Sequence, residues 1–223
     1  EPRVQGLQPA AASRRFPSYL APAMTQLPEL PLTLSRQEIR KMIRQRRRAL
    51  TPEQQQEMGQ QAATRMMTYP PVVMAHTVAI FLSFDGELDT QPLIEQLWRA
   101  GKRVYLPVLH PFSAGNLLFL NYHPQSELVM NRLKIHEPKL DVRDVLPLSR
   151  LDVLITPLVA FDEYGQRLGM GGGFYDRTLQ NWQHYKMQPV GYAHDCQLVE
   201  KLPVEEWDIP LPVVVTPSKV WEW

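Results

Sequence analysis

The sequence predicts an α/β fold, in which a single three-layer domain holds a mixed, mostly parallel sheet flanked by helices. Short apolar runs, which are typical of buried strands, alternate with segments whose apolar residues recur at helical spacing. This strand–helix–strand order favours a sheet with helices on both faces. The 223 residues suffice for one sizeable domain, and no internal repeat interrupts the pattern.

The beginning of the chain differs in composition from the rest. Residues 1–34 are rich in Pro, Ala and Gln and show no sustained hydrophobic period. Such a segment cannot bury enough apolar surface to order itself, so we expect a disordered leader. The α/β domain is then expected to span residues 35–223.

Two helices are expected to open the domain. Ser35 and Glu38 have the spacing of a capping box, and Thr51 followed by proline and then by Gln54 repeats a helix start signal. The second helix should end near Thr68, before two prolines. In the first helix, a basic stripe lies beside the apolar face because its members are spaced by three and four residues: Arg36, Arg40, Arg44 and Arg47.

Strands and helices alternate through the remainder of the chain. The strands are expected at residues 77–83, 102–109, 116–122, 151–161, 188–194 and 211–216, and the helices at 90–101 and 173–185. Pro92 in the first turn and Gly101 just after the last support the earlier of these helices. The strand at 116–122 should be antiparallel at an edge, whereas 151–161 should lead directly into a cluster of glycines.

Composition narrows the class of protein. A formal net charge of +1 gives no global attraction to nucleic acid, and no apolar run is long enough to span a membrane, so neither partner is expected. Cys196 is the single cysteine, which excludes a disulfide within the chain and indicates a reducing, cytoplasmic location. The six histidines show no metal-ligand spacing, so no zinc site is expected.

The glycine cluster is the strongest candidate for a binding site. Five of the 13 residues in "GQRLGMGGGFYDR" (165–177) are glycine, between an apolar strand and an expected helix. Backbone without side chains can approach a ligand and present several N–H groups, and a helix start adds a positive dipole end, so the segment suits a phosphate. Arg167 adds a cation. The alternative is a plain connecting turn, and the segment matches neither the Walker A nor the first-unit dinucleotide pattern.

The same segment, in its longer form "FDEYGQRLGMGGGFYDR", resembles the signature of the 5-formyltetrahydrofolate cyclo-ligase family. Three further stretches resemble that family in the right order, namely "RQEIRKMIRQRRRAL", "IFLSFDGELDT" and "LPVEEWD". The resemblance covers residues 36 to about 216. It implies a ligase of one-carbon metabolism that uses ATP and Mg²⁺ to convert 5-formyltetrahydrofolate, free or polyglutamylated, into 5,10-methenyltetrahydrofolate.

The resemblance also implies roles for individual residues. Arg40 and Arg167 would be catalytic, and Asp176 and Asp208 would hold the metal. The substrate would contact Leu82, Glu87, Met170 and Phe174. The nucleotide would be bound by Arg36, Arg40, Arg167, Leu168, Gly169, Met170, Gly171, Gly172, Gly173, Phe174 and Tyr175.

Two departures from the family pattern stand out. Some members carry Arg and Lys at the positions of Met170 and Gly172, and the family commonly has Lys at the position of Arg36. The cations near phosphate would then have to come from Arg167 and the helix arginines. A rival interpretation is a non-catalytic nucleotide- or RNA-binding module, in which the arginine helix contacts phosphates.

Overall fold

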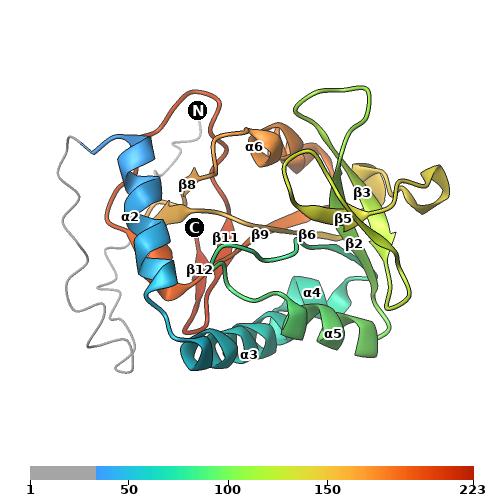
Figure 1. The fold of residues 1–223 in the computed structure, drawn as a ribbon, viewed down its shortest axis with the longest axis horizontal. Coiled ribbons are helices and arrows are strands. Elements are labelled where there is room, and N and C mark those ends of the chain that lie inside the picture. Colours follow the sequence, from blue (N-terminus) through green and yellow to red (C-terminus); the bar gives the residue numbers. More distant parts are fainter. Residues whose placement is uncertain (1–33) are drawn as a thin grey trace, which may run out of the picture.

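The computed structural model describes residues 34–223 (Figure 1). The predicted leader therefore lies outside the described residues, apart from Leu34. Helices α2 (Arg36–Arg48) and α3 (Pro52–Thr68) begin at Ser35 and Thr51, and both predicted capping boxes are present. The two prolines after Thr68 do not end helical structure altogether, because Pro70 starts the short helix α4 (Pro70–Met74).

A seven-stranded sheet forms the centre of the molecule. Its strand order is β12-β11-β9-β6-β1-β2-β3, with all inner pairs parallel and both edge strands antiparallel. The mixed, mostly parallel sheet and the antiparallel edge strand β3 confirm the prediction, whereas β12 was not predicted. The strands are β1 (Thr77–Ala79), β2 (Arg103–Leu109), β3 (Leu117–Tyr122), β6 (Val153–Thr156), β9 (Gln188–Tyr192), β11 (Val213–Val215) and β12 (Val220–Glu222).

The two faces of this sheet are covered differently. Helices α3 and α4 lie with α5 (Gln91–Arg99) on one face, as Figure 1 shows. Helix α6 (Phe174–Leu179) lies on the other, beside a three-stranded sheet of order β10-β7-β8. Side chains alternate along a strand, so Ile155 packs toward the α3–α5 face and Leu154 toward the α6 face. The smaller sheet consists of β7 (Ala160–Asp162), β8 (Arg167–Leu168) and β10 (Leu198–Val199).

The course of the chain leaves a crevice between β1 and β6. From β1 the chain moves to β2 on one side, whereas from β6 it moves to β9 and then β11 on the other. Segments that leave the carboxyl ends of β1 and β6 therefore diverge, and open α/β sheets bind ligands at such a switch point.

Three predicted elements differ from those observed. The expected strand 151–161 is divided at Pro157, so that β6 belongs to the central sheet and β7 to the small one. The expected helix 173–185 ends at Leu179, because the backbone of Gln180 is no longer helical (ψ 125) and Asn181 then takes a left-handed conformation (φ 60). The expected strand 77–83 is paired as β1 only over its first three residues, and Ile80 adds one backbone bond to Tyr105.

Smaller elements complete the domain. A hairpin that was not predicted, β4 (Leu128–Met130) with β5 (His136–Pro138), follows β3. Within residues 34–223, no helix has the length and apolar character that a membrane crossing requires. The 3₁₀ turns are η2 (Val142–Asp144), η3 (Leu148–Arg150), η4 (Trp182–His184) and η5 (Asp195–Gln197).

Candidate active site

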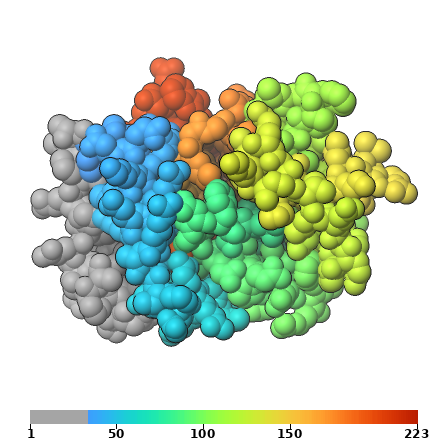
Figure 2. Space-filling view, viewed as in Figure 1, coloured from blue at the N-terminus to red at the C-terminus, as the bar shows by residue number. Residues whose placement is uncertain are grey.

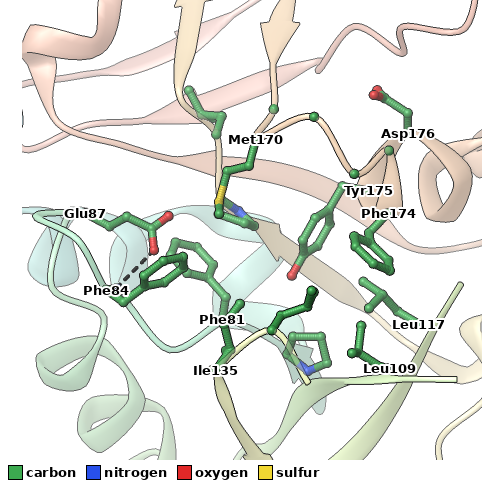
Figure 3. A pocket seen from close by; sticks show the side chains of 18 of the residues that line it. Phe81, Phe84, Glu87, Leu109, Leu117, Ile135, Met170, Phe174, Tyr175 and Asp176 are labelled. Atoms are coloured by element: carbon green, nitrogen blue, oxygen red, sulfur yellow. Dashed lines mark hydrogen bonds between the residues drawn. The ribbon is translucent and has the colours of Figure 1, made fainter. Parts of the chain in front are cut away.

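A cavity of about 690 Å³ lies at the carboxyl ends of β1, β2 and β6. In Figure 2 the surface is hollowed where the orange segment around the glycines meets the yellow segment around β5. Figure 3 shows two chemically different sides. The glycine loop, residues 169–173 between β8 and α6, forms one side, and apolar side chains with the carboxylates of Glu87 and Glu137 form the other.

The glycine loop presents backbone N–H groups that have no acceptor among the described residues. Within the described chain, no backbone N–H of residues 169–173 donates a hydrogen bond. The loop is held instead through its carbonyls, since Arg40 Nε donates to Gly169 O at 2.7 Å and Arg177 Nη1 donates to Gly172 O at 2.8 Å. Gly171 (φ 111) and Gly173 (φ 70) have left-handed backbones that a side chain would strain. The N–H groups remain available to an anion.

Arg167 forms the buried floor beside this loop. Its Nε and Nη2 donate to the carbonyl of Pro157 at 3.1 and 2.9 Å, while Nη1 lies 3.8 Å from Asp176 Oδ1. The guanidinium also lies over the Tyr175 ring, 5.5 Å from its centroid. Burial lowers the pKa of Arg167, but an arginine remains charged at neutral pH. A fixed positive charge therefore stands next to the free N–H groups.

The two predicted metal ligands lie close to each other in the fold. Asp176 Oδ1 accepts a hydrogen bond from the backbone N–H of Ile209 at 3.2 Å, which brings Asp176 to the segment that carries Asp208. Asp208 is paired with Arg36 through two contacts of 2.6 and 3.1 Å. No group of three or more His, Cys, Asp or Glu side chains suited to a metal occurs in residues 34–223. Two carboxylates fit Mg²⁺ that shares phosphate oxygens better than a cage made of protein alone.

Glu87 carries a carboxylate on the opposite side of the cavity. It is 8% exposed, and its Oε1 accepts a hydrogen bond from the Phe84 backbone N–H at 3.0 Å. Burial raises the pKa of Glu87 to about 7, although the Phe84 hydrogen bond and the nearby Arg47 both oppose that rise. Glu87 lies in a loop, eight residues after β1 ends at Ala79.

Most predicted site residues line this one cavity. Leu82, Glu87, Arg36, Arg40, Arg167, Asp176 and the segment from Gly169 to Tyr175 all contribute to its surface. Leu168 packs in a core cluster with Ile39 and Ile43 and does not line the cavity. Asp208 is also absent from the lining, and its neighbour Trp207 takes part instead.

The arginine stripe of α2 does not face one ligand as a unit. Arg36 and Arg40 point to the glycine-loop side, whereas Arg44 and Arg47 lie 3.6 and 3.7 Å from Asp85 on the Glu87 side. Residues that are three or four positions apart lie along one face of a helix, but this stripe is long enough to reach both the glycine loop and the loop that carries Glu87. The single basic face expected from the sequence therefore serves two halves of the site.

Several lining residues were not predicted from the sequence. Phe81 and Phe84 lie in the family-like stretch "IFLSFDGELDT", but the other apolar lining residues and those of the β4–β5 hairpin carry no motif. Trp207 is 64% exposed at the cavity. Its position next to Asp208 in "EEWD" is a sequence signal that could have indicated that Trp207 lines the site. The apolar wall comprises Phe81, Phe84, Leu106, Leu109, Leu117, Leu133 and Ile135.

These features define a class of protein, an α/β enzyme with its ligand cavity at the switch point of a mostly parallel sheet. The chain belongs to the 5-formyltetrahydrofolate cyclo-ligase family, whose pattern matches residues 33–217. The 5-formyltetrahydrofolate cyclo-ligase of Escherichia coli K12 is 98% identical over 182 residues, which cover 82% of this chain and 100% of that protein. The Haemophilus influenzae enzyme of the same name is 53% identical over 80% of this chain and 96% of its own length.

Solved structures agree with this assignment. The 5,10-methenyltetrahydrofolate synthetase of Aquifex aeolicus has a TM-score of 0.73 at 28% identity, covering 85% of this chain and 93% of that one. The Mycoplasma pneumoniae synthetase, at 21% identity, has a TM-score of 0.65 over 82% of this chain and 99% of its own, which supports the fold. The chain is therefore an enzyme of the cyclo-ligase type.

Proposed function

We propose that this enzyme converts 5-formyltetrahydrofolate into 5,10-methenyltetrahydrofolate in a reaction that requires ATP and Mg²⁺ and releases ADP and phosphate. The observation that carries the proposal is the glycine loop at residues 169–173, which lines the same cavity as the buried carboxylate of Glu87 and whose backbone N–H groups have no acceptor among the described residues. A phosphate-bearing ligand and a ring with N–H donors can thus meet in one space.

The chemistry explains why ATP is needed. The formyl oxygen on N5 is a poor leaving group, and transfer of the terminal phosphoryl group of ATP to that oxygen converts it into phosphate. N10 then forms a bond to the activated formyl carbon, the carbon–oxygen bond breaks, and phosphate leaves. N10 also loses its proton. The protein has to align the phosphoryl group with the formyl oxygen and stabilise the charge that develops.

The glycine-loop side is assigned to the triphosphate. Backbone N–H groups and the guanidinium of Arg167 stabilise negative charge there, and Arg40 holds the loop through the Gly169 carbonyl. Because Nε of Arg40 makes this contact, its terminal nitrogens remain available to phosphate oxygens. Mg²⁺, when bound, would neutralise phosphate charge, held by Asp176 and by Asp208 once Arg36 is exchanged for the ion.

The opposite side is assigned to the folate. Its apolar wall suits a flat aromatic ring system, and most of the cavity surface is apolar, as expected for a small-molecule site. Glu87 accepts the ring and amino N–H groups of the pterin when it is ionised. Met170 and Phe174 extend from the glycine-loop segment into the same cavity (Figure 3), which supports assigning both side chains to substrate contact.

A single optical assay tests the proposal. The methenyl product absorbs strongly in the near ultraviolet, so absorbance should rise when enzyme, 5-formyltetrahydrofolate, ATP and Mg²⁺ are mixed. Omission of ATP or chelation of the metal should each stop the rise. An absorbance change independent of ATP would contradict the proposed chemistry. Salt-sensitive RNA binding without turnover would favour the rival binding module.

A further inference from the structure

The loop that carries Glu87 is held by an ion-pair cluster to which no role has been assigned. This acidic loop, residues 84–87, contains Asp85, whose carboxylate faces three arginines of α2. Arg48 makes the closest contacts, with Nε and Nη2 at 2.9 and 2.6 Å from Asp85 Oδ1. Arg44 Nε and Arg47 Nη2 lie 3.6 and 3.7 Å from Oδ2.

We propose that Asp85 is a positioning residue for folate binding: its contacts with Arg44, Arg47 and Arg48 fix the acidic loop on α2 so that the Glu87 carboxylate faces the cavity. The inference rests on the proposed function, because it takes Glu87 to be the pterin-binding group. Asp85 itself touches neither the cavity surface nor any ligand in this assignment.

The backbone of the loop supports this reading. Asp85 has φ 53 and Gly86 has φ 74, so two consecutive residues take the left-handed conformation. A non-glycine residue in that region costs energy and persists where surrounding contacts impose it. The charged side chain of Asp85 supplies those contacts, because it joins the strained turn to a helix.

Neutral contacts hold the next residue from two other elements. The carbonyl of Gly86 accepts a hydrogen bond from Gln55 Nε2 of α3 at 3.1 Å, and His194 Nε2 lies 3.1 Å from the same oxygen. Burial lowers the pKa of His194 to about 4, so its ring is neutral, and Nε2 must carry the proton that it donates to this carbonyl. Glu87 follows directly, so its backbone position is set by α2, α3 and the segment after β9 together.

The charge of Asp85 also bears on the ionisation of Glu87. The groups that face Glu87 are Arg47 of α2, Asp85 of its own loop, Tyr175 of α6 and the neutral His194. Asp85 raises the pKa of Glu87 and Arg47 lowers it. Loss of the Asp85 charge should therefore lower the pH at which Glu87 ionises, while the hydrogen bonds to Gly86 remain.

The test compares Asp85→Asn with three other variants of the full chain. Asparagine tolerates φ > 0 as well as aspartate does, so this change removes the charge without adding backbone strain. Asp85→Glu keeps the charge, and Arg48→Gln removes the closest partner. Asp141→Asn is the matched control, because Asp141 is paired with Arg143 at the same 2.6 Å outside the site.

We expect Asp85→Asn to raise the KM for 5-formyltetrahydrofolate about fivefold, the change that corresponds to the free energy of one ion pair. The KM for ATP should stay within about twofold of the wild-type value. The pH midpoint of the folate KM should move to lower pH. Arg48→Gln should show a smaller rise, Asp85→Glu should restore part of the affinity, and Asp141→Asn should match the wild type.

Two results would overturn the inference. One is that Asp85→Asn has the same KM for 5-formyltetrahydrofolate as the wild type, although Glu87→Gln has lost affinity for this substrate. The other is an equal loss for ATP and folate with a lowered melting temperature, which indicates a general structural role. If Glu87→Gln itself binds folate normally, the pterin assignment under the proposed function is wrong, and this outcome is distinct from both.

Discussion

The two loops that face each other across the cavity are built in opposite ways. The acidic loop is fixed by its side chains and its carbonyl, through Asp85 to three arginines and through the Gly86 oxygen to α3 and His194. Among the described residues, the glycine loop is held by two arginines on its carbonyls, and its N–H groups have no acceptor. A rigid ring favours a preformed carboxylate, whereas a triphosphate needs several donors that nothing else has satisfied.

The largest effect is expected from filling the glycine loop. A Cβ at position 172 would lie 2.7 Å from the Phe174 ring, so Gly172→Val should displace that ring and fill space that we assign to the phosphates of ATP. We expect kcat/KM for ATP to fall about 100-fold, which is the effect of removing one preorganised hydrogen-bond donor from an active site. Gly101→Asn is the control, because no atom lies within 4 Å of a Cβ there. An active Gly172→Val enzyme would remove the loop from the ATP site.

The acidic side should respond in the folate parameters instead. Glu87→Gln keeps the size of the side chain but removes the charge that we propose accepts the pterin N–H groups. We expect the KM for 5-formyltetrahydrofolate to rise roughly 10- to 100-fold, the range of a hydrogen bond to a charged group, with little change for ATP. Steady-state kinetics with each substrate varied in turn would show this separation. A rise in the KM for ATP of equal size would contradict the division of the cavity into two sides.

The pH dependence should separate the two loops further. The pKa of Glu87 is raised to about 7, so the carboxylate is ionised above that pH and protonated below it. Because the ionised form accepts the pterin donors, the folate KM should rise up to about tenfold per pH unit below pH 7 and level off above pH 8. Glu87→Gln should abolish this dependence. A flat wild-type profile between pH 6 and 8 would show that Glu87 does not titrate in the free enzyme.

Removal of one proposed metal ligand should affect the Mg²⁺ requirement. Asp176→Asn keeps an oxygen that can accept from the Ile209 N–H but loses the charge. We expect the Mg²⁺ concentration for half-maximal activity to increase about tenfold, because ligand charge tunes the affinity for hard cations. An unchanged Mg²⁺ titration, equal to that of Asp141→Asn, would exclude Asp176 from the metal site.

The smallest effect is expected from adding a cation to the glycine loop. Met170 is 47% exposed and lines the cavity. Met170→Lys should lower the KM for ATP about two- to threefold at low ionic strength, and added salt should reduce this gain. Met170→Gln provides the uncharged control. Equal behaviour of the two variants would show that the backbone donors already suffice.

Local patterns predicted the elements better than they predicted their ends. The capping boxes at Ser35 and Thr51 define helix starts through short-range hydrogen bonds, and both were found where predicted. The apolar run 151–161 has no local mark that separates β6 from β7 beyond Pro157, because both halves are buried. Whether such a run joins one sheet or two depends on which strands lie beside it, and this is a long-range property.

The residues of the site show the same limit. The glycine segment and Glu87 could be assigned from the sequence because each lies within a contiguous motif. Most of the apolar wall could not, since its members from β2, β3 and the β4–β5 hairpin carry no motif of their own, whereas Phe81 and Phe84 lie in the same stretch as Glu87. The role we assign to Asp85 depends on its distance to arginines 37 to 41 residues earlier in the chain, and the sequence alone gives no measure of that distance.

By itself, the sequence determined the family, the α/β alternation and the glycines that allow left-handed backbone beside a ligand, because these depend on residue type and short spacings. Only the tertiary structure decided that the carboxyl ends of β1 and β6 diverge to leave a cavity. It also decided that α2 divides its arginines between two loops. Both follow from packing between segments far apart in the chain, where burial and ion pairing depend on distances in space.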